Sequence, residues 1–223
     1  PMDIKKDVLE ILSPYLSDVK GVYLTGSYAR NERTEESDID ILAVTNKIDK
    51  RISSGIYSII LISEKNLKDT LEKNALPLLP MIRESKPIMN GELIEKYKNT
   101  RLNRKNLKFH IGIAESSIKI NSEMIKLSGD LNEEVSDGII YSVILGLRSV
   151  YIVDCLKDNT IPSTKSLKKL VLDLAGTGEP YKAYLRSKNN RRNEQSVEPK
   201  IAQIINEYVG RKIKEQAKWI RRN

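Results

Sequence analysis

The spacing of apolar residues divides the 223-residue chain into two parts. In the first part, the β-branched runs at 19–26, 39–45 and 55–63 predict three strands. Helical spacing predicts a helix over 3–16 and a helical segment over 64–85, which Pro77 and Pro80 divide into two pieces. This alternation predicts an α/β fold, with a small mixed sheet and flanking helices.

The helical patterns become longer after residue 98. The segments 106–127, 132–156, 163–176 and 199–219 predict helices, and Gly176 is the expected C-cap of the third. The stretch 179–197 is polar and basic, which predicts a helix end and a loop. We therefore expect two domains, the α/β domain at 1–98 and an all-α helical bundle at 99–223.

One apolar stretch of 19 residues, 138–156, is nearly long enough to cross a membrane. Because it contains Arg148 and Asp154, we interpret it as the buried central helix of the bundle, with Arg148 in a buried ion pair. Cys155 is the only cysteine, so no intramolecular disulfide forms and the chain suits a reducing compartment. We expect a cytoplasmic protein with no membrane partner.

The net charge of +8 is concentrated in the second part. Residues 1–98 contain 15 Lys and Arg against 16 Asp and Glu, whereas residues 99–223 contain 23 against 14. This excess suits an acidic or nucleic-acid partner at the helical domain, for example at the basic stretch 186–192. A solvated Lys-rich helical surface explains the charge equally well, and a homodimer is left open.

Two carboxylates, Asp38 and Asp40, stand at the start of the second predicted strand. Residues i and i+2 of a strand point to the same side, so the two side chains repel each other when left alone. A hard divalent cation removes this conflict, because Mg²⁺ takes oxygen ligands from carboxylates together with phosphate oxygens. We therefore expect Asp38 and Asp40 to hold Mg²⁺ or Mn²⁺.

The pair Gly26-Ser27 ends the preceding strand, directly before a short helix. Glycine allows a phosphate to approach the backbone closely, and a helix start offers free N–H groups to phosphate oxygens. Ser27 adds a hydroxyl group, and Arg30 is a further candidate contact to phosphate, although a solvated charge explains it as well. Together with Asp-x-Asp, this predicts metal-assisted chemistry on a nucleoside triphosphate, with ATP as the first choice.

The segment TGSYARNERTEESDIDILAV resembles the nucleotidyltransferase superfamily of the DNA polymerase β type, in its minimal form. Gly26, Ser27, Asp38 and Asp40 coincide with the family pattern, strongly over 20–45 and loosely over 1–98. The layout with a helical bundle is similar to that of kanamycin nucleotidyltransferases and of HEPN-like domains. The ribonuclease form of the latter needs an Arg-x4-His motif, and the only histidine here is His110, in another predicted helix.

The resemblance implies the nucleotidyltransferase fold and its mechanism. Asp38 and Asp40 would be catalytic and hold one or two metal ions, while Gly26 and Ser27 would bind the β- and γ-phosphates. An acceptor hydroxyl would attack the α-phosphorus, and pyrophosphate would leave. The acceptor, which is a protein, a small molecule or an RNA end, is not specified by the sequence.

One residue departs from the family pattern. The family usually has a third acidic residue on the following strand, and Ser58 stands in its place. Two hypotheses follow: an active nucleotidyltransferase, or a catalytically degenerate nucleotide-binding module that interacts with a protein or RNA through its helical domain. A third is a nucleic-acid-binding bundle with a vestigial first domain. Four other acids are weaker substitutes for the missing one: Glu64, Glu133, Glu134 and Asp137.

Overall fold

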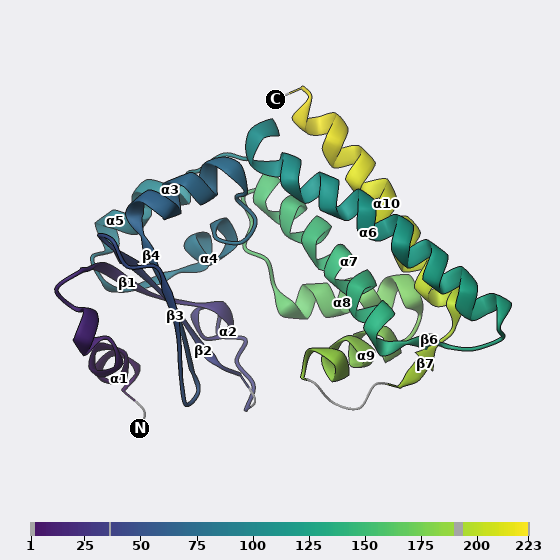
Figure 1. Cartoon of the computed structure of the whole chain (residues 1–223), viewed down its shortest axis with the longest axis horizontal. Coiled ribbons are helices and arrows are strands. Elements are labelled where there is room, and N and C mark those ends of the chain that lie inside the picture. The colour runs from purple at the N-terminus through teal and green to yellow at the C-terminus, as the bar shows by residue number, and fades with distance from the viewer. Residues whose placement is uncertain (1–2, 36, 190–193, 223) are drawn as a thin grey trace. The chain divides into compact units, whose positions relative to one another are not determined.

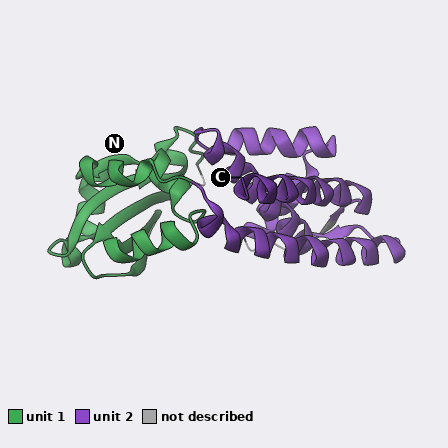
Figure 2. Ribbon diagram, turned by 90° about the horizontal axis from the view of Figure 1, so that it is seen from above, with its two compact units in different colours: residues 1–101 green, residues 102–223 purple. Residues whose placement is uncertain are grey.

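The computed structural model describes residues 3–35, 37–189 and 194–222 (Figure 1). The chain divides into two compact units, residues 1–101 and residues 102–223 (Figure 2). The first unit is a mixed sheet with flanking helices, and the second is mainly helical. The predicted fold class is therefore confirmed.

The sheet of the first unit has five strands in the order β3-β4-β2-β1-β5. Strands β2 and β4 are parallel, and the other neighbours are antiparallel. The apolar pattern does not predict β3, because its residues are polar and mostly exposed. The strands are β1 (Val19–Thr25), β2 (Ile39–Thr45), β3 (Lys50–Ser54), β4 (Tyr57–Ser63) and β5 (Lys86–Met89).

The helices of the first unit begin where local capping residues allow it. The Ser63 side chain accepts a hydrogen bond from the backbone of Asn66 at the start of α3, and Pro80 lies in the first turn of α4, where its missing N–H costs nothing. The prolines thus divide α3 from α4 as predicted. The helices are α1 (Ile4–Ile11), the 3-10 helix η1 (Ser13–Tyr15), α2 (Gly26–Ala29), α3 (Glu64–Lys73), α4 (Leu79–Glu84) and α5 (Gly91–Lys98).

The second unit contains five helices and one small β-ribbon within the described residues. Gly176 has a φ of +67° and ends α8 as its C-cap, as predicted. The sequence pattern does not predict the small ribbon that β6 (Val135–Ser136) forms with β7 (Gln195–Val197) beside these helices. The helices are α6 (Arg104–Asp130), α7 (Asp137–Lys157), α8 (Thr164–Ala175), α9 (Glu179–Lys188) and α10 (Pro199–Ile220).

A buried ion pair connects α9 to the start of α7. Both oxygens of Asp137, which is fully buried, accept hydrogen bonds from the Arg186 guanidinium at 2.7 and 2.9 Å. Arg186 also donates to Glu179 and to the hydroxyl of Ser196 in the ribbon. Arg186 therefore stabilises the bundle and is already occupied by acidic partners of its own chain. Arg191 and Arg192 of the same basic stretch lie outside the described residues.

Helix α7 is long and apolar enough to cross a membrane by length and composition alone. Ile140, Ile144 and Leu147 are completely buried in the hydrophobic core of the second unit, which explains this composition without a membrane. The prediction for Arg148 was wrong: this residue is exposed and not in a buried ion pair. It lies on the solvated side of a helix whose other sides form the core.

Candidate active site

The turn from β1 into α2 lies directly against Asp40. Gly26 begins α2 with a φ of +68°, a conformation that side chains disfavour. A Cβ atom at this position would overlap the Oδ2 atom of Asp40 and lie 3.1 Å from its Cβ atom. The structure thus brings the predicted Gly26 and Asp40 together, and only glycine leaves room for the carboxylate.

The strand register aligns Asp40 with polar residues on both neighbouring strands. Asp40 pairs with Thr25 of β1 on one side and with Ser58 of β4 on the other. The Thr25 hydroxyl donates a hydrogen bond to the Asp40 carbonyl oxygen at 3.1 Å. Directly paired residues of adjacent strands point to the same face. Ser58 therefore lies beside Asp40 on the face where a third acid would complete a metal site.

Glu84, the last residue of α4, holds the same turn from the other side. Its Oε1 atom accepts a hydrogen bond from the Gly26 backbone N–H at 2.7 Å, and its Oε2 atom accepts one from Arg30. Glu84 is buried, with a side-chain exposure of 5%. One carboxylate thus fixes both ends of the short helix α2.

The Arg30 guanidinium lies between two carboxylates, Glu84 and Glu32, and donates to Glu32 at 2.9 Å. Burial disfavours its charge, but the hydrogen bonds and charges of the two glutamates outweigh burial and raise the pKa of Arg30. The observed contacts make Arg30 a residue that positions α2. A contact to phosphate remains a prediction.

The other two predicted residues are Asp38 and Ser27. Asp38 is exposed and lies just before β2, two residues from Asp40, and Ser27 is half-buried in α2. No group of three or more His, Cys, Asp or Glu side chains is arranged to hold a metal within 3–35, 37–189 and 194–222. The fit to a divalent cation therefore rests on two carboxylates, of which Asp40 fills the room that Gly26 leaves by lacking a side chain.

Two of the weaker substitutes for the third acid are engaged elsewhere. Glu64 lies at the other end of β4, about 20 Å along the strand from Ser58. It accepts hydrogen bonds from Lys20, Tyr97 at 2.7 Å and Lys68, which lower its pKa to about 2. In the second unit, the buried Asp137 is paired with Arg186. Neither carboxylate is available to the Asp40 site.

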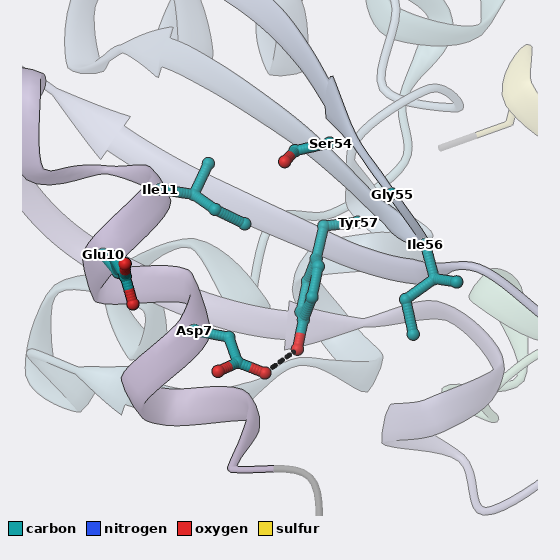
Figure 3. A pocket seen from close by; sticks show the side chains of 7 residues that line it. All are labelled: Asp7, Glu10, Ile11, Ser54, Gly55, Ile56 and Tyr57. Carbon is teal, nitrogen blue, oxygen red and sulfur yellow. Dashed lines mark hydrogen bonds between the residues drawn. The ribbon is translucent and has the colours of Figure 1, made fainter.

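A shallow pocket lies on the opposite face of the sheet (Figure 3). It is lined by Asp7 and Ile11 of α1 and by residues 54–57, and the Tyr57 hydroxyl donates to Asp7 at 2.6 Å. Because Tyr57 and Ser58 are consecutive in β4, their side chains point to opposite faces. This pocket is therefore separate from the Asp40 face.

Comparison with known proteins finds similarity to nucleotidyltransferases. Residues 3–112 match the family described as the nucleotidyltransferase domain. The match covers just under half of the chain, so residues 3–112 are similar to a nucleotidyltransferase domain. Over 41 residues the chain is 54% identical to a candidate protein adenylyltransferase of Methanocaldococcus jannaschii, and the match covers 18% of this chain and 41% of that protein.

Two solved structures are similar to the whole chain at low identity. The spectinomycin adenyltransferase of Enterococcus faecialis, solved with ATP and spectinomycin, has a TM-score of 0.48 and 16% identity, over 94% of this chain and 97% of that one. A nucleotidyltransferase-like protein of Exiguobacterium sibiricum has a TM-score of 0.42 and 12% identity, over 96% and 76%.

Sequence reasoning missed Glu84 and Glu32 as parts of the site. Glu84 is 58 residues from Gly26 in the chain and occurs at the end of an ordinary helical pattern. A charged residue among the apolar positions of a short helix is too common to signal a contact. Only the packing of α4 beside β1 and α2 reveals it.

Proposed function

We propose that this protein is a Mg²⁺-dependent nucleotidyltransferase that transfers a nucleoside monophosphate, most simply AMP from ATP, to a hydroxyl acceptor. The observation that carries the proposal is the contact between Asp40 and the Gly26 turn, within a domain that matches the nucleotidyltransferase family. The family match supports the reaction class. The geometry supports the residues to which we assign it.

Some of these residues would bind the metal ion, and the others would position the phosphate groups. Asp38 and Asp40 would hold Mg²⁺, which supplies charge neutralisation on the triphosphate when bound. Gly26 lets the turn lie directly against the Asp40 carboxylate, and its backbone N–H, which donates to Glu84, would have to exchange that partner to bind a phosphate oxygen. Ser27 offers a hydroxyl donor to that phosphate, and Glu84 and Arg30 fix the helix from which Ser27 projects. The rate would come mainly from positioning and charge stabilisation.

A protein hydroxyl is the acceptor we propose to test first. The chain is similar over 41 residues to a candidate protein adenylyltransferase, although it spans only about two fifths of that protein's length. The positive excess of residues 99–223 is the reason to test RNA as the second acceptor class.

A catalytically degenerate nucleotide-binding module is the second candidate, and Ser58 favours it. Ser58 occupies the place beside Asp40 where a third carboxylate would add charge and an oxygen ligand. Two carboxylates bind Mg²⁺ more weakly than three, so the metal would enter mainly together with the nucleotide.

Label transfer from each α-labelled nucleoside triphosphate tests the proposal. The protein is incubated with Mg²⁺ or Mn²⁺, alone and with protein or RNA fractions. Asp40→Asn is the variant expected to be inactive, and Asp69→Asn, in α3 with a side-chain exposure of 47%, is the matched control. Label that moves to an acceptor with the wild type and Asp69→Asn, but not with Asp40→Asn, supports the enzyme. Transfer that survives Asp40→Asn contradicts the role of this carboxylate.

A binding measurement separates the two candidates. If no fraction is labelled but the protein binds Mg²⁺-ATP, and Asp40→Asn weakens that binding, the degenerate module is correct. If the wild type neither transfers label nor binds any nucleoside triphosphate, both candidates are excluded.

A further inference from the structure

Helix α6 carries a row of large apolar side chains on its exposed face. Their exposed fractions lie between 41% and 61%, which is high for residues of this kind. We call this row the α6 stripe. Its members are Phe109, Ile113, Ile120, Met124, Leu127 and Leu131.

The α6 stripe is distinct from the face by which α6 packs into its own unit. Leu107, Ala114 and Ile125 are buried, and α6 packs against α7 and α10. At 100° per residue, the six members of the stripe fall within an arc of about 60°. Ile113, Ile120 and Leu127 repeat every seven residues, and Met124 and Leu131 repeat in the same way. This period is typical of a helix that packs along another helix.

The α6 stripe is nearly symmetric about Ile120. Phe109 and Leu131 lie eleven residues to either side of it, and Ile113 and Leu127 lie seven residues to either side. A second α6 running antiparallel, with its Ile120 opposite the first, would therefore place apolar residues against apolar residues over about 33 Å. Ser116, which would face Met124, already donates its hydroxyl to the Gly112 carbonyl oxygen at 3.1 Å, so its burial leaves no unpaired donor.

The charges at the ends of α6 favour the same arrangement. Exposed Arg104 and Lys108 lie in its first turns, Asp130 is its last residue, and Glu133 and Glu134 follow in the connection to β6. Both groups oppose the helix macrodipole, which favours negative charge at the start and positive charge at the end. An antiparallel copy would bring the basic start of one helix beside the acidic end of the other.

We propose that the α6 stripe is a self-association surface, through which two copies of this chain pair by antiparallel packing of their α6 helices. The proposal is independent of the nucleotidyltransferase activity. Its first test is the molar mass of the full chain over a concentration series, by light scattering after gel filtration or by sedimentation. The wild type is expected to form dimers.

Ile120→Lys places two positive charges at the centre of the contact and should raise the dimer dissociation constant at least about thirtyfold. Leu172→Lys is the matched control, because Leu172 is 48% exposed on α8 and outside the stripe. It should leave the dissociation constant unchanged. Far-ultraviolet circular dichroism checks folding, and Met124→Lys serves as the second variant. A monomeric wild type, or equal effects of Ile120→Lys and Leu172→Lys, overturns the proposal.

Cross-linking tests the orientation in a Cys155→Ala background. Phe109→Cys mixed with Leu131→Cys should form a disulfide between chains, whereas neither variant alone should do so. Single variants that cross-link only with themselves would show parallel packing and overturn the antiparallel arrangement. If the stripe binds a different protein and never a second copy, the mass measurement shows a monomer and the proposal fails.

Discussion

The Oε1 atom of Glu84 accepts a hydrogen bond from the backbone N–H of Gly26 at 2.7 Å, and this contact connects α4 to the turn of the candidate site. The same carboxylate binds Arg30 through its other oxygen. A buried carboxylate with two charge-assisted or backbone partners fixes a turn more firmly than van der Waals packing alone. The position of the Gly-Ser turn thus depends on a residue far away in the chain.

Glu84→Gln should loosen this turn. The amide keeps the shape of the carboxylate but removes its charge, so Arg30 loses one of its two ion pairs with Glu84 and Glu32. We expect the free energy of unfolding to fall by about 1–3 kcal/mol in urea titrations. Glu95→Gln, at a solvent-exposed ion pair with Lys98, should cost less than about 1 kcal/mol. Equal losses in the two variants would show that Glu84 has no special role.

Gly26→Ala should be more damaging than the same change at Gly55. Both glycines have a positive φ, +68° and +56°, so backbone strain should lower the free energy of unfolding of both variants by about 1–2 kcal/mol. Only at Gly26 does the new Cβ overlap Asp40, whereas nothing lies within 4 Å at Gly55. Urea unfolding should therefore show a larger loss for Gly26→Ala, and label transfer should fall only in this variant. The idea fails if the two alanine variants behave alike.

Ser58→Asp should make the stability of the protein depend more strongly on Mg²⁺. The new carboxylate would lie beside Asp40, so without a divalent cation the two negative charges repel and Tm should fall. Added Mg²⁺ should raise Tm more in this variant than in the wild type. Ser53→Asp, on the next strand beyond Ser58, is the matched control and should respond less.

The label-transfer activity of Ser58→Asp also distinguishes the two candidate functions. Activity that appears or rises in this variant would mean that the wild type has lost catalytic activity together with the third acidic residue. Unchanged activity in an active protein would mean that another group fills the role of the third acid.

His110 should make the protein less stable in mild acid. It is the only histidine and is buried in α6, with one ring nitrogen 3.3 Å from the Gln216 amide oxygen. Burial lowers its pKa below the usual 6.5, although the hydrogen bond with Gln216 opposes the shift. The unfolded chain therefore binds the proton first, so stability is full above about pH 6.5 and falls as the pH decreases.

His110→Gln should remove this dependence. Urea unfolding of the wild type between pH 7.5 and 5.5 should lose up to about 1.4 kcal/mol per pH unit below pH 6.5, whereas the variant should stay nearly constant. A variant that keeps the same slope would assign the pH dependence to other groups.

The sequence determined the features that depend on neighbours along the chain. Short apolar, β-branched runs predicted β1, β2 and β4, the prolines separated α3 from α4, and Gly176 marked the end of α8. The Gly-Ser turn and the Asp-x-Asp pair were also visible, because both lie within 15 residues of each other. Such features follow from local sterics, capping and strand periodicity, which the sequence alone encodes.

The tertiary structure decided the features that join distant segments. Glu84 reaches Gly26 across 58 residues, Ser58 lies beside Asp40 only through the strand register, and Arg186 pairs with Asp137 across 49 residues. Periodicity also assigned Ile113 and Ile120 to the same helix as buried Ile125, without showing that they face outward. A helical pattern identifies apolar positions, but which of them are buried depends on where the neighbouring helices pack.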